Sequence, residues 1–520
     1  MRPFPLRCAP TRARARRRVL RDLLQCGNPL LNLENEVRMM KYQIEAQPFG
    51  AYDVVVCGGG TAGCFAAIAA AREGAKTLLI ERSFTVGGML TVGEAGITKF
   101  SEHCCDVDVY KREVLDELGR SPERVQVVRG LAHEYVKRMI DSGMALGTHG
   151  EAGSYVFTDK AEAQWVLMQM LAEADVEVLY DTRVVLVNKN GDSVTGVVVC
   201  NKNGFCEIGA RVVVDATGDA DVAALAGAPF VVGATEEEVA TGFAKKTGEM
   251  QSFGTMYRIR NLDFARLFDY LQKNPDRFVT HQFGVMSLEN VIESYQKGEM
   301  CVFRINLKEH STDRGSGNVQ VYNLPERDEA ILLGPCCADA KNANGLDSRK
   351  VSIAQYNLQR GTRILTGVLK EHVPGFENVR ITYIPDVGVR ETRHIVGEYR
   401  LSVIDVLSGK DFEDSVACGG HPLDIHPLPK EVENVELNHW RFHIPYRVML
   451  PLNVENLLVA GRPISASRGA SGATRPTAQC MALGEAAGIA AAMAVKENKT
   501  PKTIDVQALR ARLLENGAII

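Results

Sequence analysis

The segment Asp424-Ile425-His426 places a histidine two residues after an aspartate, and this is the acid–base candidate that the sequence favours. Histidine changes its charge near neutral pH, and a nearby carboxylate can orient the imidazole ring and tune its pKa. Such a pair could remove a proton from a substrate or return one to it. The competing interpretation is a histidine whose role is structural only.

Two arginines precede this pair, Arg390 and Arg393, and His394 follows the second of them. At spacings of three and four residues, these side chains would share one face of a helix. Two guanidinium groups on one face could bind a carboxylate or sugar hydroxyls as part of a catalytic site. The alternative is that Arg390 forms a structural ion pair with Glu391 or Glu398.

Three further catalytic candidates lie in the segment HIPYR, namely His443, Tyr446 and Arg447. This segment comes shortly before the apolar stretch NLLVAG, residues 456–461, which is typical of a short buried strand. We expect the three side chains to lie close to the site that this strand helps to form.

A glycine-rich turn must position a ligand for this chemistry. The apolar run at 52–57 predicts a parallel strand buried on both faces, and Gly58-x-Gly60-x-x-Gly63 follows it directly. The first glycine permits a tight turn, the second lets a phosphate approach the backbone, and the third lets the next helix pack closely. Glu81 ends the next strand about twenty residues further on, where a carboxylate can accept both hydroxyls of an adenosine ribose. The pattern predicts a dinucleotide site and does not by itself distinguish NAD from FAD; its residues are Gly58, Gly60, Thr61, Ala62, Gly63, Glu81 and Arg82.

Composition limits the classes of partner. The 520 residues are 45% hydrophobic and carry a formal net charge of -4, so the chain can bury a large core and is expected to form two or three domains. Because there is no basic excess, we expect a small-molecule substrate and neither nucleic acid nor a membrane as partner. The oligomeric state stays open.

The cysteines indicate a compartment and argue against a metal. There are 13, an odd number, and no two have the C-x-x-C spacing, which indicates a reducing environment and predicts a cytoplasmic protein. Cys104-Cys105, with His103 before them, and Cys336-Cys337 lack the spacing of zinc ligands. We expect no metal site.

The beginning of the chain differs from the rest. Residues 1–21 contain eight arginines and no acidic residue, a composition that cannot form a packed core and is typical of a transit peptide or a basic arm. We expect residues 1–45 to be a disordered extension and the fold to start near Met40.

A second glycine turn follows a predicted set of hairpins. Asn190-Gly191 and Asn203-Gly204 stand at hairpin positions between apolar strands. The last of these strands runs into Ala216-Thr217-Gly218, within the longer segment DATGDADVAALAG. That strand would return the chain to a position beside the first one.

With this A-T-G turn the sequence resembles the FAD-dependent oxidoreductases of the glutathione-reductase-like superfamily, and the longer segment is similar to the branch related to fumarate reductase and succinate dehydrogenase flavoproteins. The resemblance covers about residues 50–495 and implies FAD rather than NAD. It also implies an α/β fold class, a Rossmann-like FAD-binding domain (a parallel sheet with a β-meander) plus an inserted α+β substrate or cap domain. We expect the following boundaries: 46–235 and 386–500 for the two parts of the FAD-binding domain, 236–385 for the substrate domain, and 501–520 for a C-terminal tail or helix.

The resemblance also assigns further cofactor positions. In the family that this sequence resembles, the N-terminus of a long helix points at the flavin pyrimidine ring, and N–H groups there stabilise the negative charge of the reduced ring. In this chain that helix would run from Pro476 to about Ala494. Arg475 would add a full charge. In the fumarate reductase branch, covalently bound FAD is attached through a histidine just after the first glycine region. Because residues 82–100 contain no histidine, the resemblance implies that FAD is bound non-covalently here. The further FAD-binding candidates are Gly87, Gly88, Met89, Val184, Ala216, Thr217, Gly218, Gly461, Arg462, Gly472, Ala473 and Thr474.

These observations predict an FAD-dependent dehydrogenase or reductase that moves a hydride between flavin N5 and a polar metabolite, with His426 as acid or base. Two alternatives remain open. One is a flavin-dependent hydroxylase that uses NAD(P)H and oxygen, although no second G-x-G-x-x-G is present. The other is an electron-transfer subunit without turnover alone.

Overall fold

The computed structural model describes residues 43–93, 97–98, 101–102, 125–147, 155–280, 287–310, 317–334, 343–426 and 441–520. The chain divides into two compact units, Met1–Glu45 and Ala46–Ile520. The described helices and strands all lie in the second unit. The predicted basic extension and the paired cysteines at 104–105 and 336–337 fall outside the described residues, apart from the last few residues of the extension.

The largest sheet has the order β8-β2-β1-β11-β10-β9, and β22 pairs with β11. The pairs among β8, β2, β1, β11 and β22 are parallel, whereas β9, β10 and β11 form an antiparallel meander. Val54, Val55 and Val56 are fully buried, as expected of a strand covered on both faces. The α/β fold class with a parallel sheet and a β-meander is therefore confirmed. The strands are β1 (Gln47–Cys57), β2 (Thr77–Ile80), β8 (Glu177–Leu179), β9 (Arg183–Asn190), β10 (Ser193–Asn201), β11 (Gly204–Asp215) and β22 (Leu457–Val459).

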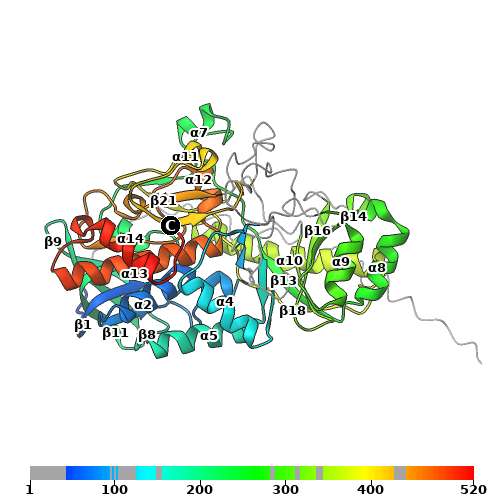
Figure 1. Ribbon diagram of the computed structural model, residues 1–520, viewed down its shortest axis with the longest axis horizontal. Coiled ribbons are helices and arrows are strands. Elements are labelled where there is room, and N and C mark those ends of the chain that lie inside the picture. Colours follow the sequence, from blue (N-terminus) through cyan, green and yellow to red (C-terminus); the bar gives the residue numbers. More distant parts are fainter. Residues whose placement is uncertain are drawn as a thin grey trace, which may run out of the picture. The chain divides into compact units, whose positions relative to one another are not determined.

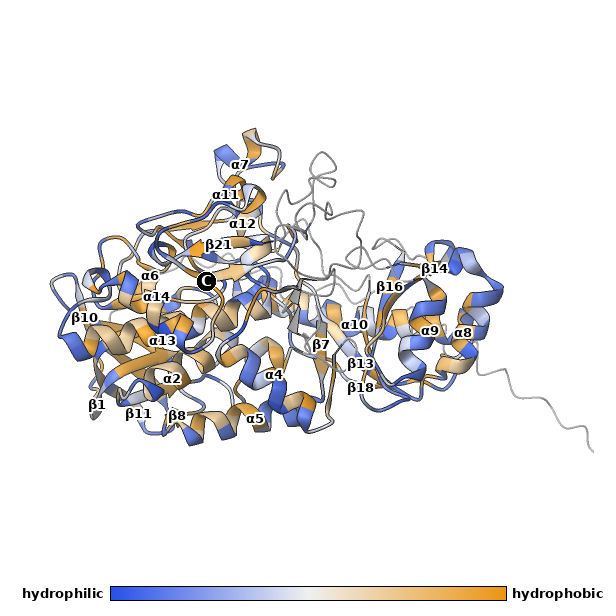
Figure 2. Cartoon of the chain, in the orientation of Figure 1, coloured by the Kyte–Doolittle hydropathy of each residue, from blue (hydrophilic) through white to orange (hydrophobic). Residues whose placement is uncertain are grey.

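Two apolar helices lie side by side against this sheet, α2 (Thr61–Arg72) and α13 (Thr477–Glu497) (Figures 1 and 2). Their approach is close because a Cβ added at Gly484 or Gly488 would lie 2.2 Å from a carbonyl oxygen of α2. By length and composition α13 could cross a membrane, but 94% of its apolar window is buried inside the protein. It is a core helix, and it begins one residue later than expected because Pro476 is its N-cap.

A second sheet has its own core. Its order is β14-β15-β16-β17-β13-β18, and every neighbouring pair is antiparallel. Helices α8, α9 and α10 pack against one face through residues such as Phe268, Val291 and Leu369 (Figure 1). These elements lie within the range predicted for the substrate domain. They are β13 (Met256–Arg260), α8 (Phe264–Lys273), β14 (Phe278–Val279), α9 (Leu288–Gln296), β15 (Val302–Asn306), β16 (Asn318–Asn323), β17 (Ala330–Leu333), α10 (Ser348–His372) and β18 (Arg380–Tyr383).

The remaining elements are short segments and helices that connect these layers. They are η1 (Gly88–Leu90), β3 (Ile97–Thr98), β4 (Ser101–Glu102), β5 (Val125–Gln126), α4 (Leu131–Asp141), β6 (Ala145–Gly147), β7 (Tyr155–Thr158), α5 (Lys160–Glu173), α6 (Asp221–Leu225), β12 (Phe230–Val232), α7 (Glu236–Ala240), η3 (Pro275–Arg277), η4 (Lys308–His310), β19 (Arg393–Ile395), α11 (Val403–Ser408), β20 (Ser415–Gly419), β21 (Phe442–Pro445), η7 (Tyr446–Met449), α12 (Arg468–Thr474), η8 (Pro501–Thr503) and α14 (Val506–Glu515).

Arg390, Arg393 and His394 do not lie on a helix, which was the condition for a shared face. Residues 393–395 form β19, which pairs antiparallel with Phe230–Val232 of β12. This partner is more than 160 positions away in the sequence, so the local spacing of charged residues did not reveal it. The three side chains therefore do not share one helical face.

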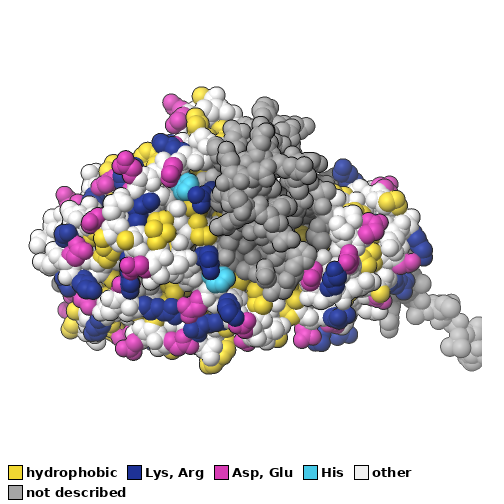
Figure 3. Space-filling view, viewed as in Figure 1, with side chains coloured by type: hydrophobic (Ala, Val, Ile, Leu, Met, Phe, Trp, Pro, Cys, Tyr) yellow, Lys and Arg dark blue, Asp and Glu magenta, His cyan; other side chains and the backbone are white. Residues whose placement is uncertain are grey.

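Basic and acidic side chains are mixed over the described part of the face shown in Figure 3. This mixing agrees with the near-neutral charge balance of the sequence.

Candidate active site

The first glycine turn has the geometry that its spacing predicts. Gly58 has a φ of 100°, and a Cβ added there would lie 2.5 Å from the carbonyl oxygen of Ala216. A Cβ at Gly63 would lie 1.8 Å from the carbonyl oxygen of Gly58, so helix and strand pack too closely for a side chain. At Gly60 an added Cβ would meet nothing within 4 Å. Space is thus kept at the one glycine expected to face a phosphate.

Helix α2 begins directly at this space. Gly60 is its N-cap, no side chain caps it, and its first turn carries no acidic residue. The N–H groups of Thr61, Ala62 and Gly63 therefore stand at a helix N-terminus that can bind an anion. The hydroxyl of Thr61 donates to the carbonyl oxygen of Gly87 at 3.3 Å.

Glu81, at the end of β2, lies against the glycine turn. Its carboxylate accepts hydrogen bonds from the N–H groups of Gly59 at 2.7 Å and Ser83 at 2.8 Å. The N–H of Thr182 donates to the Glu81 carbonyl at 3.0 Å, which places the start of β9, with Val184, next to this residue. A carboxylate oxygen has two lone pairs, so Glu81 can still accept from a ligand.

The second glycine pair, Gly87-Gly88, joins the first turn. The N–H of Gly87 donates to the carbonyl oxygen of Gly59 at 2.8 Å, and a Cβ at Gly88 would lie 3.1 Å from the Cα of Gly60. Met89 follows in η1 with a largely exposed side chain. The two glycine segments predicted to hold one cofactor are therefore in contact.

The A-T-G turn is organised by Asp215, which the sequence analysis did not single out. This fully buried carboxylate accepts hydrogen bonds from the N–H and hydroxyl of Thr217 and from the N–H of Ala223. Burial raises the pKa of Asp215 to about 6. The turn, with Ala216 and Gly218, is thus fixed beside Gly58.

Asp219 follows Gly218 and was also missed, although a G-D pair after an apolar strand was visible in the sequence. Its carboxylate accepts from Arg462 at 2.6 Å and from the hydroxyl of Thr392 at 2.9 Å. Burial alone would raise the pKa of Asp219, but Arg462 and Arg82 help to hold it below its usual value. Arg82 and Arg462 therefore both lie toward this turn. Gly461 packs against Ala62, where an added Cβ would lie 3.0 Å from the Ala62 Cβ.

Three of the FAD-binding candidates lie outside the long helix α13 and therefore do not provide N–H groups at its start. Gly472, Ala473 and Thr474 lie within α12, a separate short helix capped by Ser467. A Cβ at Gly472 would lie 3.0 Å from the backbone nitrogen of Asp424. These residues thus support the segment that carries the predicted acid–base pair.

Several buried polar atoms around α12 and the start of α13 have no hydrogen-bond partner within the described residues. They are Arg468 Nε, Arg468 Nη2, Ser471 Oγ, Thr474 Oγ1, Arg475 Nε, Gln479 Oε1 and Gln479 Nε2. Buried polar groups are normally paired, so such a group of atoms is typical of a place where a polar ligand or water binds. Together with the open space at Gly60 and the uncapped α2, these atoms fit a large polar dinucleotide such as FAD.

Asp424 joins Arg475 to His426. Nη2 of Arg475 lies 2.5 Å from Oδ2 of Asp424, and Nε2 of His426 lies 2.6 Å from Oδ1 of the same carboxylate. Burial alone would raise the pKa of Asp424, but the charges of Arg475 and His426 hold it well below its usual value. The carboxylate is therefore charged and orients both neighbours.

His426 is poised as a base on one nitrogen. Since Nε2 donates to Asp424, the neutral ring keeps its proton there, and Nδ1 carries a lone pair that no described residue binds. Desolvation lowers the pKa of His426, Asp424 opposes this effect, and Arg390 and Arg475 add to it. The side chain keeps 44% of its surface exposed, so a substrate can reach it.

Arg390 and Arg393 have different surroundings. Arg390 donates to the carbonyl oxygen of Ser252 at 2.8 Å and lies near enough to His426 to affect its pKa. Arg393 donates to Asp221 at 2.8 Å and to the carbonyl of Asp219 at 2.9 Å. The structure brings Arg390 to the candidate site, whereas Arg393 forms an ion pair with Asp221, a partner that the sequence did not suggest.

His443, Tyr446 and Arg447 have their contacts elsewhere. The hydroxyl of Tyr446 donates to the carbonyl oxygen of Pro501 at 2.9 Å, and Arg447 binds both carboxylate oxygens of Asp414. His443 lies next to Ser415 and Cys418 on the neighbouring strand β20. None of these described contacts involves Asp424 or His426. The three side chains bind the β20–β21 region together.

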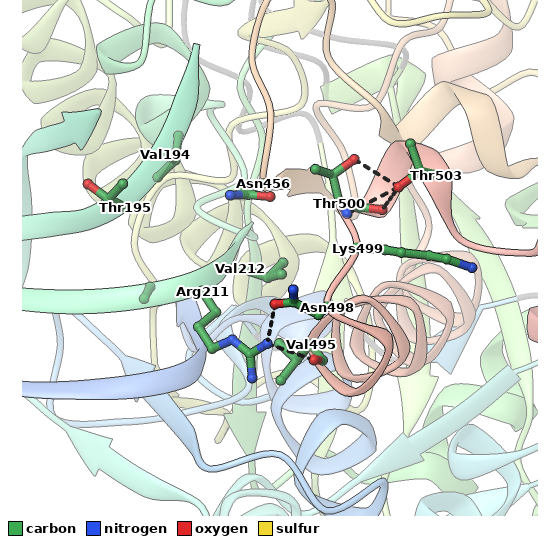
Figure 4. Close-up of a pocket in the computed structure, with 11 residues that line it drawn as sticks. Val194, Thr195, Arg211, Val212, Asn456, Val495, Asn498, Lys499, Thr500 and Thr503 are labelled. Carbon is green, nitrogen blue, oxygen red and sulfur yellow. Dashed lines mark hydrogen bonds between the residues drawn. The ribbon is translucent and has the colours of Figure 1, made fainter. Parts of the chain in front are cut away.

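A pocket of about 550 Å³ lies away from the glycine turns (Figure 4). Its lining includes Val212, in the middle of β11, and Asn498, at the C-terminal end of α13. The glycine turns and His426 are absent from its lining. It is a separate surface feature, and its Arg211 is engaged by Val495 and Asn498.

Comparison with known proteins identifies the family. A family model described as FAD dependent oxidoreductase matches residues 53–513. This match includes both glycine turns, the second sheet, the Asp424–His426 pair and α13.

Two curated proteins are similar to parts of the chain. NADH:fumarate oxidoreductase from Klebsiella pneumoniae is 29% identical over 195 residues, which are 32% of this chain and 20% of that protein. Digeranylgeranylglycerophospholipid reductase from Methanocaldococcus jannaschii is 29% identical over 149 residues, 27% of this chain and 32% of that protein. The chain thus matches only about a fifth to a third of the length of these relatives.

Solved structures cover more of the chain at lower similarity. A geranylgeranyl bacteriochlorophyll reductase-like protein from Thermoplasma acidophilum has a TM-score of 0.41 and 15% identity over 90% of this chain and 84% of that chain. A p-nitrophenol 4-monooxygenase from Pseudomonas putida has a TM-score of 0.41 and 13% identity over 87% of this chain and 82% of that chain.

Proposed function

The chain belongs to the family of FAD dependent oxidoreductases, and from this premise we propose that it transfers a hydride between FAD and a polar small-molecule substrate, with His426 moving the accompanying proton. One observation carries the proposal. Asp424 lies between Arg475, at 2.5 Å, and His426, at 2.6 Å, and Arg475 comes just before α13. This arrangement gives an oriented base with a free nitrogen and an accessible ring.

The glycine turns are the proposed FAD site. The N–H groups at the start of α2 would bind the pyrophosphate, and Glu81 would accept the ribose hydroxyls. Gln479 and Arg475 offer buried polar atoms without described partners, which suits the polar edge of a flavin. Because residues 82–100 contain no histidine for attachment, we propose that FAD is held non-covalently, so that acid denaturation releases all of the yellow colour.

FAD, when bound, accepts or donates a hydride at N5. In the oxidative direction the substrate loses a hydride from carbon and a proton from oxygen or nitrogen, two electrons in all. Nδ1 of His426 takes this proton, and the positive ring that forms is stabilised by the carboxylate of Asp424. Arg475 keeps Asp424 charged and in place. The reverse direction uses the same groups, with His426 returning the proton.

The substrate is proposed to be a small polar metabolite in the cytoplasm. The cysteines that the structure describes are all free thiols, as expected in a reducing compartment. Fold and family set a class of chemistry and not a substrate. The second sheet and its loops therefore decide which metabolite binds.

Anaerobic reduction of the bound flavin tests the proposal. FAD-loaded protein is mixed without oxygen with hydroxy acids, sugars and NAD(P)H, and the visible spectrum is recorded. Bleaching by a metabolite supports the proposal. Bleaching by NAD(P)H alone, followed by oxygen consumption with an aromatic substrate, identifies a hydroxylase instead. Bleaching by none of them contradicts turnover by this chain alone and indicates an electron-transfer subunit.

A further inference from the structure

The main chain of His426, like its side chain, is hydrogen-bonded. Its N–H donates to Oε1 of Gln251 at 3.4 Å, and its carbonyl oxygen accepts from the N–H of Ser252 at 2.9 Å. Two consecutive residues therefore bind both backbone groups of His426. The contact with Asp424 fixes the ring, and this second contact fixes the backbone from which the ring extends.

Gln251 and Ser252 are themselves held by another pair of consecutive residues. The N–H of Gln251 donates to Oε2 of Glu391 at 2.8 Å, and Nη1 of Arg390 donates to the carbonyl oxygen of Ser252 at 2.8 Å. Gln251 and Glu391 are each only 1% exposed. Arg390 and Glu391 therefore bind Gln251 and Ser252. These two residues in turn bind His426.

These two pairs are the points at which the chain enters and leaves the second sheet. Gln251-Ser252 come shortly before β13, and Arg390-Glu391 come shortly after β18. The two strands are neighbours in the sheet. Their extensions also pair, because Gly254 and Gly388 exchange both backbone hydrogen bonds, at 3.1 Å and 2.7 Å.

The segment before β13 and the segment after β18, here called the crossing segments, pack tightly against each other. A Cβ added at Gly254 would lie 2.6 Å from Nη1 and Nη2 of Arg390, and one at Gly388 would lie 2.8 Å from the carbonyl oxygen of Gly254. A shift of either crossing segment therefore moves the other. It also moves the backbone of His426, since Gln251 and Ser252 bind it on both sides.

The buried side chain of Gln251 uses only part of its hydrogen-bonding capacity among the described residues. Its Oε1 accepts from His426, whereas its Nε2 is buried without a partner among the described residues. A buried amide with one bond unmade is costly, so methionine or leucine would suit packing alone better.

We propose that Gln251 is a positioning residue for His426, and that the paired crossing segments transmit the placement of the second sheet to the acid–base group. The inference rests on the proposed role of His426. The second sheet and His426 belong to one hydrogen-bonded unit. A substrate bound against the second sheet would therefore be held at a fixed position relative to His426.

The first test needs no substrate. Protein labelled with 15N-histidine is compared as wild type and Gln251→Met, and the His426 signal is assigned by its loss in His426→Gln. We expect a single Nε2–H tautomer in the wild type, and in Gln251→Met a mixture of tautomers or a shifted titration. An unchanged His426 signal in Gln251→Met overturns the inference.

The second test is a double-mutant cycle on the rate of anaerobic flavin reduction by whichever hydroxy acid or sugar bleaches the wild type. In the wild-type background, Gln251→Met should lower the rate about tenfold, because one hydrogen bond that positions His426 is lost. In the His426→Gln background, the same substitution should lower the rate less than about twofold. FAD affinity should not change. Thr366→Val, which removes a buried hydrogen bond to Tyr257 in the same domain, is the control and should leave the rate unchanged.

Equal losses in both backgrounds overturn the inference, because Gln251 would then act without His426. If His426→Gln reduces as fast as the wild type, the proposed role of His426 fails, while a changed tautomer in Gln251→Met still supports the positioning contact. The two failures are therefore distinguishable.

Discussion

Nε2 of His426 lies 2.6 Å from Oδ1 of Asp424, and the other oxygen of that carboxylate lies 2.5 Å from Arg475. The carboxylate thus fixes the tautomer of the histidine and is itself held charged by the arginine. A neutral His426 with a free Nδ1 is the form that can take a proton from a substrate.

The first prediction concerns Asp424→Asn. The amide keeps the size of the side chain but removes the charge that stabilises the protonated ring, so the rate of flavin reduction should fall by about 10²- to 10⁴-fold. FAD affinity should remain within a small factor of the wild type. Stopped-flow absorbance at the flavin band measures both. A variant as fast as the wild type would show that Asp424 has no part in the chemistry.

The second prediction is a pH profile. The pKa of His426 is lowered from its usual value, and the base must be neutral to act. The rate of flavin reduction should therefore rise with pH, with the midpoint of the rise below about pH 6.5, the usual pKa of histidine, and a plateau above that midpoint. Asp424→Asn should move the rise to still lower pH, because Asp424 raises the pKa of His426. A profile that rises only above pH 7 would contradict this environment for the base.

The third prediction compares two glycines of one turn. Gly60→Ala adds a methyl group to open space, so the protein should fold with an unchanged Tm but bind FAD about 10- to 100-fold more weakly, since the methyl would occupy the phosphate position. Gly58→Ala, at φ 100° and 2.5 Å from a carbonyl oxygen, should lower the free energy of unfolding by more than about 1 kcal/mol. Calorimetry and FAD titration separate the two effects. Normal FAD affinity in Gly60→Ala would argue against a phosphate at that space.

The fourth prediction concerns Glu485, a carboxyl in α13 that is 1% exposed. It accepts from the N–H of Leu131 at 3.0 Å and so caps α4, while burial raises its pKa to about 8. A raised folded pKa means that the stabilisation is complete below the unfolded pKa of about 4.5 and is lost as pH rises toward 8.

Glu485→Gln keeps an acceptor for Leu131 and cannot ionise. It should therefore raise the Tm relative to the wild type at pH 8 and change it little at pH 5, with a difference in unfolding free energy of order 3 kcal/mol at neutral pH. Thermal unfolding at the two pH values measures this. If the Tm difference is the same at both pH values, Glu485 does not ionise between pH 5 and pH 8, and its pKa is not raised to about 8.

The fifth prediction separates structure from catalysis. Tyr446→Phe removes the hydrogen bond to the carbonyl of Pro501 and should cost about 1 to 2 kcal/mol of stability. Its rate of flavin reduction should stay within twofold of the wild type, because no described contact joins Tyr446 to His426. A large loss of rate with bound FAD would restore Tyr446 as a catalytic candidate.

How far the sequence predicted this structure depends on the range of the interactions. The turn at Gly58, Gly60 and Gly63 was predictable because strand, turn and helix are consecutive and each glycine has a local reason. Whether the segment from Arg390 to His394 is helical could not be decided from its spacing, because β19 owes its conformation to pairing with β12, far away in the sequence. Local charge spacing contains no information about that partner.

The site itself shows the same division. The spacing of Asp424 and His426 suggested their pairing, but Arg475, 51 positions later, could be placed against Asp424 only once the fold was known. Gln251 carried no sequence signal at all. Tyr446 and Arg447 looked catalytic by type and position, yet their side chains bind Pro501 and Asp414.

The most direct test is the rate of anaerobic flavin reduction in His426→Gln, at equal bound FAD, with the metabolite that bleaches the wild-type protein. If His426 moves the proton that accompanies hydride transfer, the rate falls by about 10²- to 10⁴-fold while the flavin spectrum before mixing is unchanged. A rate equal to that of the wild type, with FAD fully bound, would contradict the role of His426 and with it the catalytic arrangement built on Asp424 and Arg475.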